Sequence, residues 1–266
     1  MKLDLSDTTF LIPIRIDSID RLENILAVIK FLRHYFNTNI MVLEASTGTN
    51  SFLMRLLPKD RKVNYMFIHD DDPIFFRTHY INMMAKETHT PIIAVWDADA
   101  IIPVKQIMQA VEQIRLGRAD VSHPYDGTCL EASDILRQLF IQTGNVKYLE
   151  KNLSKMKVLY QAKSMTGGGF FLNTDKYKQA GMENEHFYGW GPEDFERYSR
   201  WQAFDYKLFR TEGFMVHLTH QRDINSHFNS VFQMKNLNLE LARTRNSSRN
   251  QIIQHLKLNI NEKNEN

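Results

Sequence analysis

The sequence has one cysteine, Cys129, among its 266 residues, so no disulfide can form within the chain. This scarcity favours a reducing compartment, and we expect a cytoplasmic protein. Charge of one sign is also scarce, because 33 Lys and Arg balance 31 Asp and Glu to a net charge of +2. We therefore expect no nucleic-acid partner. The 11 glycines and 7 prolines exclude collagen-like and low-complexity architectures.

Long apolar runs are absent as well. No run approaches the roughly 18 residues that a transmembrane helix needs, and the opening MKLDLSDTTF does not resemble a secretory signal. Hydrophobic residues make up 43% of the chain, which is ordinary for a globular protein. We expect a soluble or peripheral protein with a sizeable core.

What the sequence does contain is an alternation of short apolar runs and helical patterns. Buried strands are expected at 10–14, 40–43, 63–68 and 91–95, and from Val121. Helices are expected from a capping box at Asp20 and Glu23, over 75–86, and from Pro103 to Gly117. This order predicts an α/β fold with a mainly parallel central sheet flanked by helices.

The second half of the chain is less regular. Helices are expected at 131–142, 193–203 and 237–258, and strands at 170–172 and 214–218. Residues 145–166 are polar and contain five lysines. We interpret them as a loop or short helix, either a lid over a ligand or a solvated surface segment.

The first chemical motif is Asp97-Ala98-Asp99, directly after an apolar strand. Open α/β sheets bind ligands at the carboxyl ends of their strands. Carboxylate oxygens suit Mg²⁺ or Mn²⁺, and such a cation can bridge a diphosphate. A solvated turn or a helix cap is the alternative.

The second motif is His217-Leu-Thr-His220, which follows another apolar run. Two imidazoles close together can ligate a borderline metal ion. Their spacing of three does not place both on one face of a regular strand, so one of them needs a bend or a bulge. The alternative is one structural and one surface histidine.

The third motif is the stretch YGWGPED at 188–194. Glycines on both sides of Trp190 let the backbone turn sharply and approach a ligand, and the indole offers a flat apolar face that suits a sugar ring. Glu193 and Asp194 begin a helix, whose dipole favours the ionised state that a general base requires. The alternative is a plain helix start with a buried tryptophan.

Two arginines complete the set. Arg15 lies at the end of the first strand and Arg77 near the start of a helix. Guanidinium groups at the rim of a sheet can form paired bonds to phosphate. Surface salt bridges are the alternative.

Together and in this order, these motifs resemble the beta-1,4-galactosyltransferase family and its bacterial relatives. Residues 167–198 are similar to its acceptor-side segment, which has a Gly-Gly pair, a strand, a helix and then Trp-Gly-Trp-Gly-Gly-Glu-Asp. Tyr188 and Pro192 depart from this pattern. The matching positions are Trp190, Gly191, Glu193 and Asp194. Shorter stretches that resemble the family are 13–15, 75–82, 96–103 and 217–223.

The resemblance implies a GT-A fold and a nucleotide-sugar-dependent glycosyltransferase that uses Mn²⁺ or Mg²⁺. The implied metal ligands are Asp99, His220 and His217, with Asp97 supporting them. The implied contacts to a UDP-sugar donor are Pro13, Arg15, Glu44, Arg77, Asp97 and Gly168. The implied contacts to the acceptor and the sugars are Tyr188, Trp190, Gly191, Glu193 and Asp194, with Asp194 as the catalytic base. The family's second N-terminal arginine aligns with Asp17.

The implied glycosyltransferase domain spans 1–230, with a nucleotide-binding half at about 1–102 and an acceptor half at about 103–230. Residues 231–266 are expected to form a helical, partly disordered basic tail. Leu237, Leu241, Ile252 and Leu256 could give this tail an apolar face. Such a helix can lie on the inner face of a membrane, where a lipid-linked glycan acceptor would be found. Covering the core or forming a dimer are the alternatives.

Other functions stay open at this point. A sugar-1-phosphate nucleotidyltransferase is disfavoured because residues 10–25 contain no glycine for a nucleotide loop. A non-catalytic carbohydrate- or nucleotide-sugar-binding protein and a retaining transferase of the same fold are further alternatives. Our interpretation is an inverting transferase that moves a hexose or N-acetylhexosamine to a glycan, in the synthesis of a surface polysaccharide such as a capsule.

Overall fold

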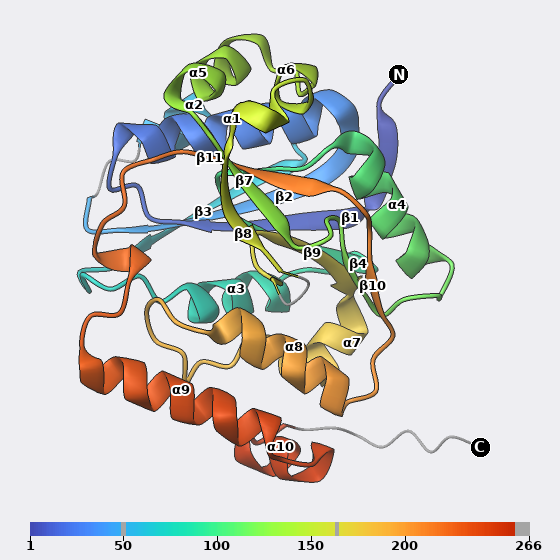
Figure 1. The fold of residues 1–266 in the computed structure, drawn as a ribbon, viewed down its shortest axis with the longest axis vertical. Coiled ribbons are helices and arrows are strands. Elements are labelled where there is room, and N and C mark those ends of the chain that lie inside the picture. The colour runs from blue at the N-terminus through green and yellow to red at the C-terminus, as the bar shows by residue number, and fades with distance from the viewer. Residues whose placement is uncertain (49–51, 163–164, 259–266) are drawn as a thin grey trace.

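The computed structural model describes residues 1–48, 52–162 and 165–258. Its centre is a seven-stranded sheet (Figure 1). In sheet order the strands are β10 (Leu208–Arg210), β6 (Val121–His123), β9 (Gly169–Asn173), β4 (Ile92–Trp96), β1 (Leu3–Ile14), β2 (Phe36–Ser46) and β3 (Val63–His69). Strand β9 runs antiparallel to β4 and β6, whereas the other neighbouring pairs are parallel. The expectation of an α/β fold with a mainly parallel sheet is confirmed.

The two faces of this sheet bury alternate residues of each strand. On β1, Phe10 and Ile12 belong to one hydrophobic cluster and Leu11 belongs to another. On β4, Trp96 joins the first cluster, where its ring packs edge-on against Phe10 at 5.2 Å. Because successive strand residues point to opposite faces, a run without polar gaps marks a strand covered on both sides.

Helices cover both faces of the sheet (Figure 1). The first cluster is covered by α1 (Ile19–Tyr35), α2 (Phe52–Leu56), α4 (Val104–Arg115), α5 (Asp134–Thr143) and α6 (Lys147–Glu150). The second is covered by α3 (Arg77–Lys86), α7 (Thr174–Gln179), α8 (Glu193–Ala203) and α10 (Arg249–His255). Helix α9 (Val231–Arg245) lies outside α8. In the described part of the chain, no helix is long and apolar enough to cross a membrane.

A second, four-stranded sheet was not predicted. In sheet order its strands are β5 (Ala100–Ile101), β11 (Phe214–Leu218), β7 (Thr128–Ala132) and β8 (Lys157–Gln161). The helix expected at 131–142 begins at Asp134, because Ser133 caps it and Glu131 belongs to β7. The segment 145–166 holds the expected short helix but also β8, which only its pairing with β7 reveals.

Three predicted helix boundaries also differ. Helix α1 is capped by Ser18, whose side chain accepts a hydrogen bond from the Arg21 backbone N–H, so the capping box at Asp20 and Glu23 was wrong. Pro103 precedes the first residue of α4 instead of being that residue. The single helix expected at 237–258 is two helices, because Ser248 starts a capping box for α10.

The first part of the expected tail packs against the body. Leu237, Leu241 and Ile252 are buried, and Leu256 is half-buried against the second cluster. Thr244 on α9 also donates a hydrogen bond to Glu196 on α8 at 3.0 Å. The four apolar residues that suggested a membrane-facing side therefore face the protein. The end of the tail, 259–266, lies outside the described residues.

Candidate active site

A cavity of about 550 Å³ opens where β1 and β4 end. Its wall is built from the ends of those strands, the loop before β9, the start of α8 and the segment that follows β11. The lining includes almost every residue expected to carry chemistry: Pro13, Arg15, Arg77, Asp97, Asp99, Gly168, Trp190, Gly191, Glu193, Asp194, His217 and His220. The carboxyl ends of parallel strands therefore gather residues that lie far apart in the sequence.

Asp99, His217 and His220 form a compact cluster in this cavity. Asp99 Oδ2 lies 3.2 Å from His220 Nε2 and 3.6 Å from His217 Nε2. Their ligand atoms all lie within 4.8 Å of one another. His220 Nδ1 lies 2.7 Å from the Gln221 carbonyl, a contact that fixes the ring and leaves Nε2 facing Asp99. The bend that the spacing of the histidines required is the end of β11 at Leu218.

Hydrogen bonds from neighbouring segments fix the loop that carries these histidines. The Leu218 backbone N–H donates to the Asp99 carbonyl at 2.8 Å. Asn24 on α1 donates through Nδ2 to the Leu218 and Thr219 carbonyls, and Arg137 on α5 donates to Asn24 Oδ1 at 2.8 Å. Two helices thus fix the position of the cluster.

The electrostatics of the cluster suit a cation. Burial opposes ionisation of Asp99, but His217 and His220 outweigh it and lower the pKa of the carboxyl. Burial works against protonation of His220, but its hydrogen bond to Asp99 raises the pKa of the imidazole overall. One carboxylate and two imidazoles are a donor set that fits Mn²⁺ and related divalent ions. The side-chain atom His217 Nδ1 is buried and has no hydrogen-bond partner among the described residues.

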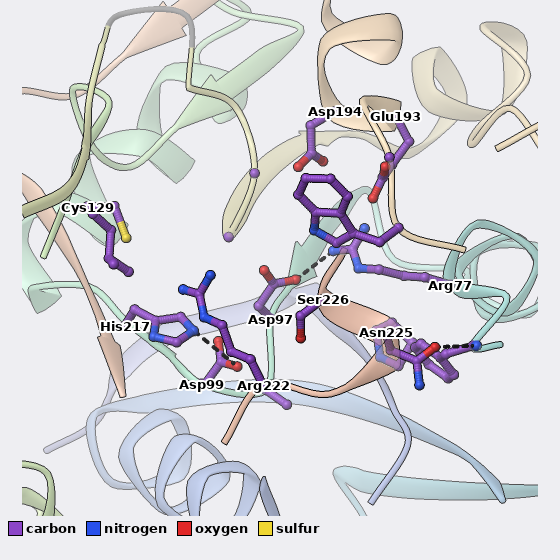
Figure 2. Close-up of a pocket in the computed structure, with 18 of the residues that line it drawn as sticks. Arg77, Asp97, Asp99, Cys129, Glu193, Asp194, His217, Arg222, Asn225 and Ser226 are labelled. Carbon is purple, nitrogen blue, oxygen red and sulfur yellow. Dashed lines mark hydrogen bonds and ion pairs between the residues drawn. The ribbon is translucent and has the colours of Figure 1, made fainter. Parts of the chain in front are cut away.

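The Asp97 side chain points away from the group of Asp99, His217 and His220. Its Oδ1 accepts a hydrogen bond from Arg77 at 2.6 Å, and its backbone N–H donates to the Gly168 carbonyl at 2.9 Å. Figure 2 shows Asp97 between Asp99 on one side and the two acids of α8 on the other. Asp97 thus lies between the opposite wall and the group of Asp99, His217 and His220, and does not belong to that group.

The opposite wall carries the predicted acceptor residues. Trp190 is 42% exposed, and its ring packs edge-on against Phe228 at 4.9 Å. Gly191 lies against Leu237, which a Cβ at this position would approach to 2.6 Å. The chain therefore passes close to α9 here, and Trp190 lines the cavity beside it.

Glu193 and Asp194 point into the cavity from the start of α8 (Figure 2). Glu193 is buried, and burial together with the neighbouring Asp194 raises its pKa to about 8, although Arg77 opposes the shift. Asp194 forms an ion pair with Arg197, which lies fully inside the protein. Two adjacent carboxyl groups therefore sit in different environments, a common arrangement in acid–base sites.

Two of the predicted contacts are not among the described residues that line the cavity: Glu44 and Tyr188. Glu44 is buried on β2 and accepts a hydrogen bond from the Tyr65 hydroxyl at 2.8 Å. The Tyr188 hydroxyl donates to Asp72 at 2.5 Å, so this side chain braces the loop that carries Trp190.

Several residues to which the sequence assigned no role also line the cavity: Asp17, Arg21, Tyr125, Cys129, Arg222 and Asn225. Arg21 Nε lies 2.9 Å from Asp17. Asp17 stands where the resembled family has its second N-terminal arginine, so Arg21 places a guanidinium group beside that position. The Arg222 guanidinium lies 4.0 Å from Glu131. The position of Arg222 close to the predicted histidines was the available signal; Tyr125 and Cys129 gave none.

The raised pKa of Glu193 predicts a pH-dependent stability. The folded protein keeps a proton on Glu193 up to about pH 8, whereas the unfolded chain loses it near pH 4.5. The free energy of unfolding should therefore contain a contribution that is complete below pH 4.5 and is lost as the pH rises to 8. Glu193→Gln removes this contribution, so relative to the wild type it should gain about 1–3 kcal/mol between pH 5 and pH 9. Urea unfolding at both values measures the difference, and parallel pH profiles for the two proteins would refute the assignment.

The comparisons with known proteins concern the fold and one segment of the chain. Residues 147–222 match a family model described as the N-terminal domain of galactosyltransferase. A search of curated protein sequences finds no match to the chain. Among solved structures, Drosophila beta-1,4-galactosyltransferase 7 with manganese, UDP-Gal and xylobiose bound is similar with a TM-score of 0.52 and 16% identity, over 84% of this chain and 76% of that one.

A second similar structure is a mannosyltransferase from Pyrobaculum calidifontis in complex with GDP-Man and Mn²⁺. Its TM-score is 0.52 and its identity 13%, over 81% of this chain and 58% of that one. These likenesses show the fold, and the family model covers the segment that carries Trp190, Asp194 and both histidines. The chain therefore has the GT-A glycosyltransferase fold and resembles the galactosyltransferases, as its motifs predicted.

Proposed function

We propose that this protein is an inverting, divalent-cation-dependent glycosyltransferase that moves a hexose or N-acetylhexosamine from a UDP-sugar to a hydroxyl group of a glycan. One observation carries the proposal. A carboxylate–imidazole cluster and a pair of adjacent acids on a helix start face the same cavity of about 550 Å³. That cavity is large enough for a nucleotide-sugar-sized ligand.

A cation held by Asp99, His217 and His220 would stabilise the leaving group. A sugar nucleotide departs as a diphosphate, whose negative charge must be neutralised as the glycosidic bond breaks. Asp99, His217 and His220 would hold Mn²⁺ or Mg²⁺, which supplies a Lewis acid at the phosphates. Arg21 and Arg222 also line the cavity and add positive charge. The structure of the Drosophila relative with manganese and UDP-Gal and that of the Pyrobaculum relative with GDP-Man and Mn²⁺ support this assignment.

The acids of α8 would serve the acceptor. An acceptor hydroxyl is a weak nucleophile until a nearby carboxylate removes its proton. We assign this role to Asp194, which Arg197 orients. Glu193 keeps its proton near neutral pH, so it can donate a hydrogen bond to a sugar hydroxyl. Trp190 offers the flat apolar surface on which a sugar ring packs.

Inversion is the simplest outcome of this arrangement. The acids of α8 and the metal cluster lie on opposite sides of Asp97 (Figure 2). A base on one side and a leaving group on the other favour in-line displacement at the anomeric carbon. The anomeric configuration of the product, read by NMR, distinguishes this mechanism from retention.

Loss of the metal cluster is expected to abolish turnover. We expect UDP release from one member of a panel of UDP-galactose, UDP-glucose and their N-acetylhexosamine counterparts, with Mn²⁺ or Mg²⁺ and not with EDTA. Asp99→Asn should reduce this release at least ~100-fold because it removes a charged ligand. Asp71→Asn is the matched control, because Asp71 is exposed and lies outside the cavity. Metal-independent release, or equal rates for both variants, would contradict the proposal.

The catalytic base gives a separate test. Asp194→Asn keeps the shape of the side chain but cannot accept the acceptor proton, so transfer should fall by about 10²–10⁴-fold. Binding of UDP with Mn²⁺, measured by calorimetry, should change little. Near wild-type transfer by this variant would remove Asp194 from the mechanism, and a matching loss of UDP binding would assign it a structural role instead.

We further propose that the enzyme works in surface polysaccharide synthesis, in the cytoplasm and against the inner face of a membrane. The support is an outward face of α9 on which Phe232 and Leu239 are 74% and 66% exposed. Exposed basic residues lie along the same helix and the next: Lys235, Arg243, Arg245 and Arg249. An apolar and basic face suits an anionic lipid surface, where lipid-linked acceptors are found.

Membrane contact through α9 can be measured directly. The double variant Phe232→Gln with Leu239→Gln should bind vesicles of phosphatidylcholine and phosphatidylglycerol about tenfold more weakly than the wild type in co-sedimentation. Vesicles without phosphatidylglycerol, or added salt, should weaken the wild type too. Ile135→Gln, at an exposed position on α5, is the matched control. Equal binding of all three proteins would exclude this face.

A further inference from the structure

A second group of potential metal ligands lies outside the cavity. Glu240 on α9, His255 on α10 and His186 in the loop between α7 and α8 bring their ligand atoms within 4.8 Å of one another. None of the three lines the candidate active site. Residues from three separate segments therefore meet at one point, on the side of the molecule where α9 and α10 cover α8 (Figure 1).

We propose that Glu240, His186 and His255 form a structural site for a borderline divalent cation, of which Zn²⁺ is the natural occupant. His186 Nδ1 lies 3.0 Å and His255 Nε2 2.7 Å from the same oxygen, Glu240 Oε1. Both ring nitrogens thus lie within hydrogen-bond distance of the same carboxylate oxygen. Two imidazoles and one carboxylate are a known ligand set for zinc, with a fourth position left for water.

The burial of the three side chains fits a site with an open position. The Glu240 side chain is 8% exposed, His255 is 27% exposed and His186 is 55% exposed. The carboxylate therefore forms the floor, while the exposed edge of His186 leaves access for an ion and for water. This differs from a surface pair of histidine and glutamate, in which the acid is solvated.

The neighbours of Glu240 act as supporting groups for a ligand. Arg243 NH1 donates to the other oxygen, Glu240 Oε2, at 2.9 Å, and Asn184 Nδ2 donates to Oε1 at 2.9 Å. Metal-ligating carboxylates are commonly oriented by such hydrogen bonds. Arg243 NH1 also lies 3.2 Å from His255 Nε2. Its side chain is 56% exposed, so it can move from His255 toward solvent while an ion takes its place.

The site would join the acceptor side of the cavity to the C-terminal helices. His186 lies four residues before Trp190, and Glu240 lies on the helix against which Gly191 packs. An ion held by all three segments would fix the loop that presents Trp190. We therefore expect bound zinc to stabilise the fold and not to take part in the transfer reaction.

The experiment first disables the group of Asp99, His217 and His220 by mutation and then titrates the variant with Zn²⁺. In the background Asp99→Asn with His220→Ala, the metal-free protein should bind one equivalent of Zn²⁺, and saturating Zn²⁺ should raise Tm by about 5–10 °C. Adding His186→Ala should lower the affinity for Zn²⁺ at least tenfold and abolish the Tm shift. Adding His255→Gln should do the same. Adding His89→Ala, at an exposed histidine elsewhere on the surface, should change neither.

The outcomes separate this site from the candidate active site. Co²⁺ can replace Zn²⁺ as a probe, and its visible absorption should report imidazole ligands in the background protein. That absorption should be lost when His186 is replaced, a readout that does not depend on enzyme activity. A background protein that binds no Zn²⁺ would overturn the proposal, as would one whose binding persists unchanged in both histidine variants. His186→Ala is expected to fold, because its side chain is more than half exposed.

Discussion

The candidate active site depends on a guanidinium group that lies wholly inside the protein. Arg197 pairs with Asp194 at the cavity and with buried Glu183 behind it, and it stacks over the Phe170 ring at 4.3 Å. Glu183 is further fixed by a hydrogen bond from the Tyr177 hydroxyl at 2.6 Å. A buried charge without its partner typically costs about 3–5 kcal/mol. Arg197 therefore ties the position of Asp194, the proposed base, to the hydrophobic core.

A second arginine, Arg77, holds carboxylates in place across the cavity in the same way. Arg77 forms an ion pair with Asp97. Burial lowers the pKa of Arg77, but Asp97 and Asp194 outweigh burial and raise it overall. Without these two arginines the acids of the two walls would repel one another in a poorly hydrated space. The glycines of the loop before β9 make the close approach possible, because a Cβ at Gly167 would meet Asp194 Oδ2 at 2.3 Å. Gly168 adopts a φ of +81° and presents its carbonyl to the Asp97 backbone.

Sequence patterns predicted those parts of the fold that local periodicity determines. Strand 214–218 and helix 193–203 have the predicted bounds, since apolar runs and helix starts are local signals. The small sheet could not be predicted, because β7 and β8 become strands only by pairing with each other and with β11. Long-range pairing of this kind leaves no periodic trace in a largely exposed strand such as β8.

In the site, too, local motifs could be predicted and tertiary contacts could not. The acids, histidines and tryptophan were predicted as site residues because each belongs to a short motif whose chemistry can be recognised in the sequence. Their supports were not, because Asn24 and Arg137 act through tertiary hydrogen bonds to a loop nearly two hundred residues away from Asn24. Glu44 and Tyr188 were predicted as contacts from the resemblance alone. In the structure the Glu44 carboxylate bonds to Tyr65 and the Tyr188 hydroxyl bonds to Asp72, and neither is among the described residues that line the cavity.

The C-terminal helices also help to hold the site in place. Gln233 on α9 donates to the Tyr188 carbonyl at 2.9 Å, and Leu237 packs against Gly191. The segment that the sequence set apart as a tail therefore shapes the loop that carries Trp190.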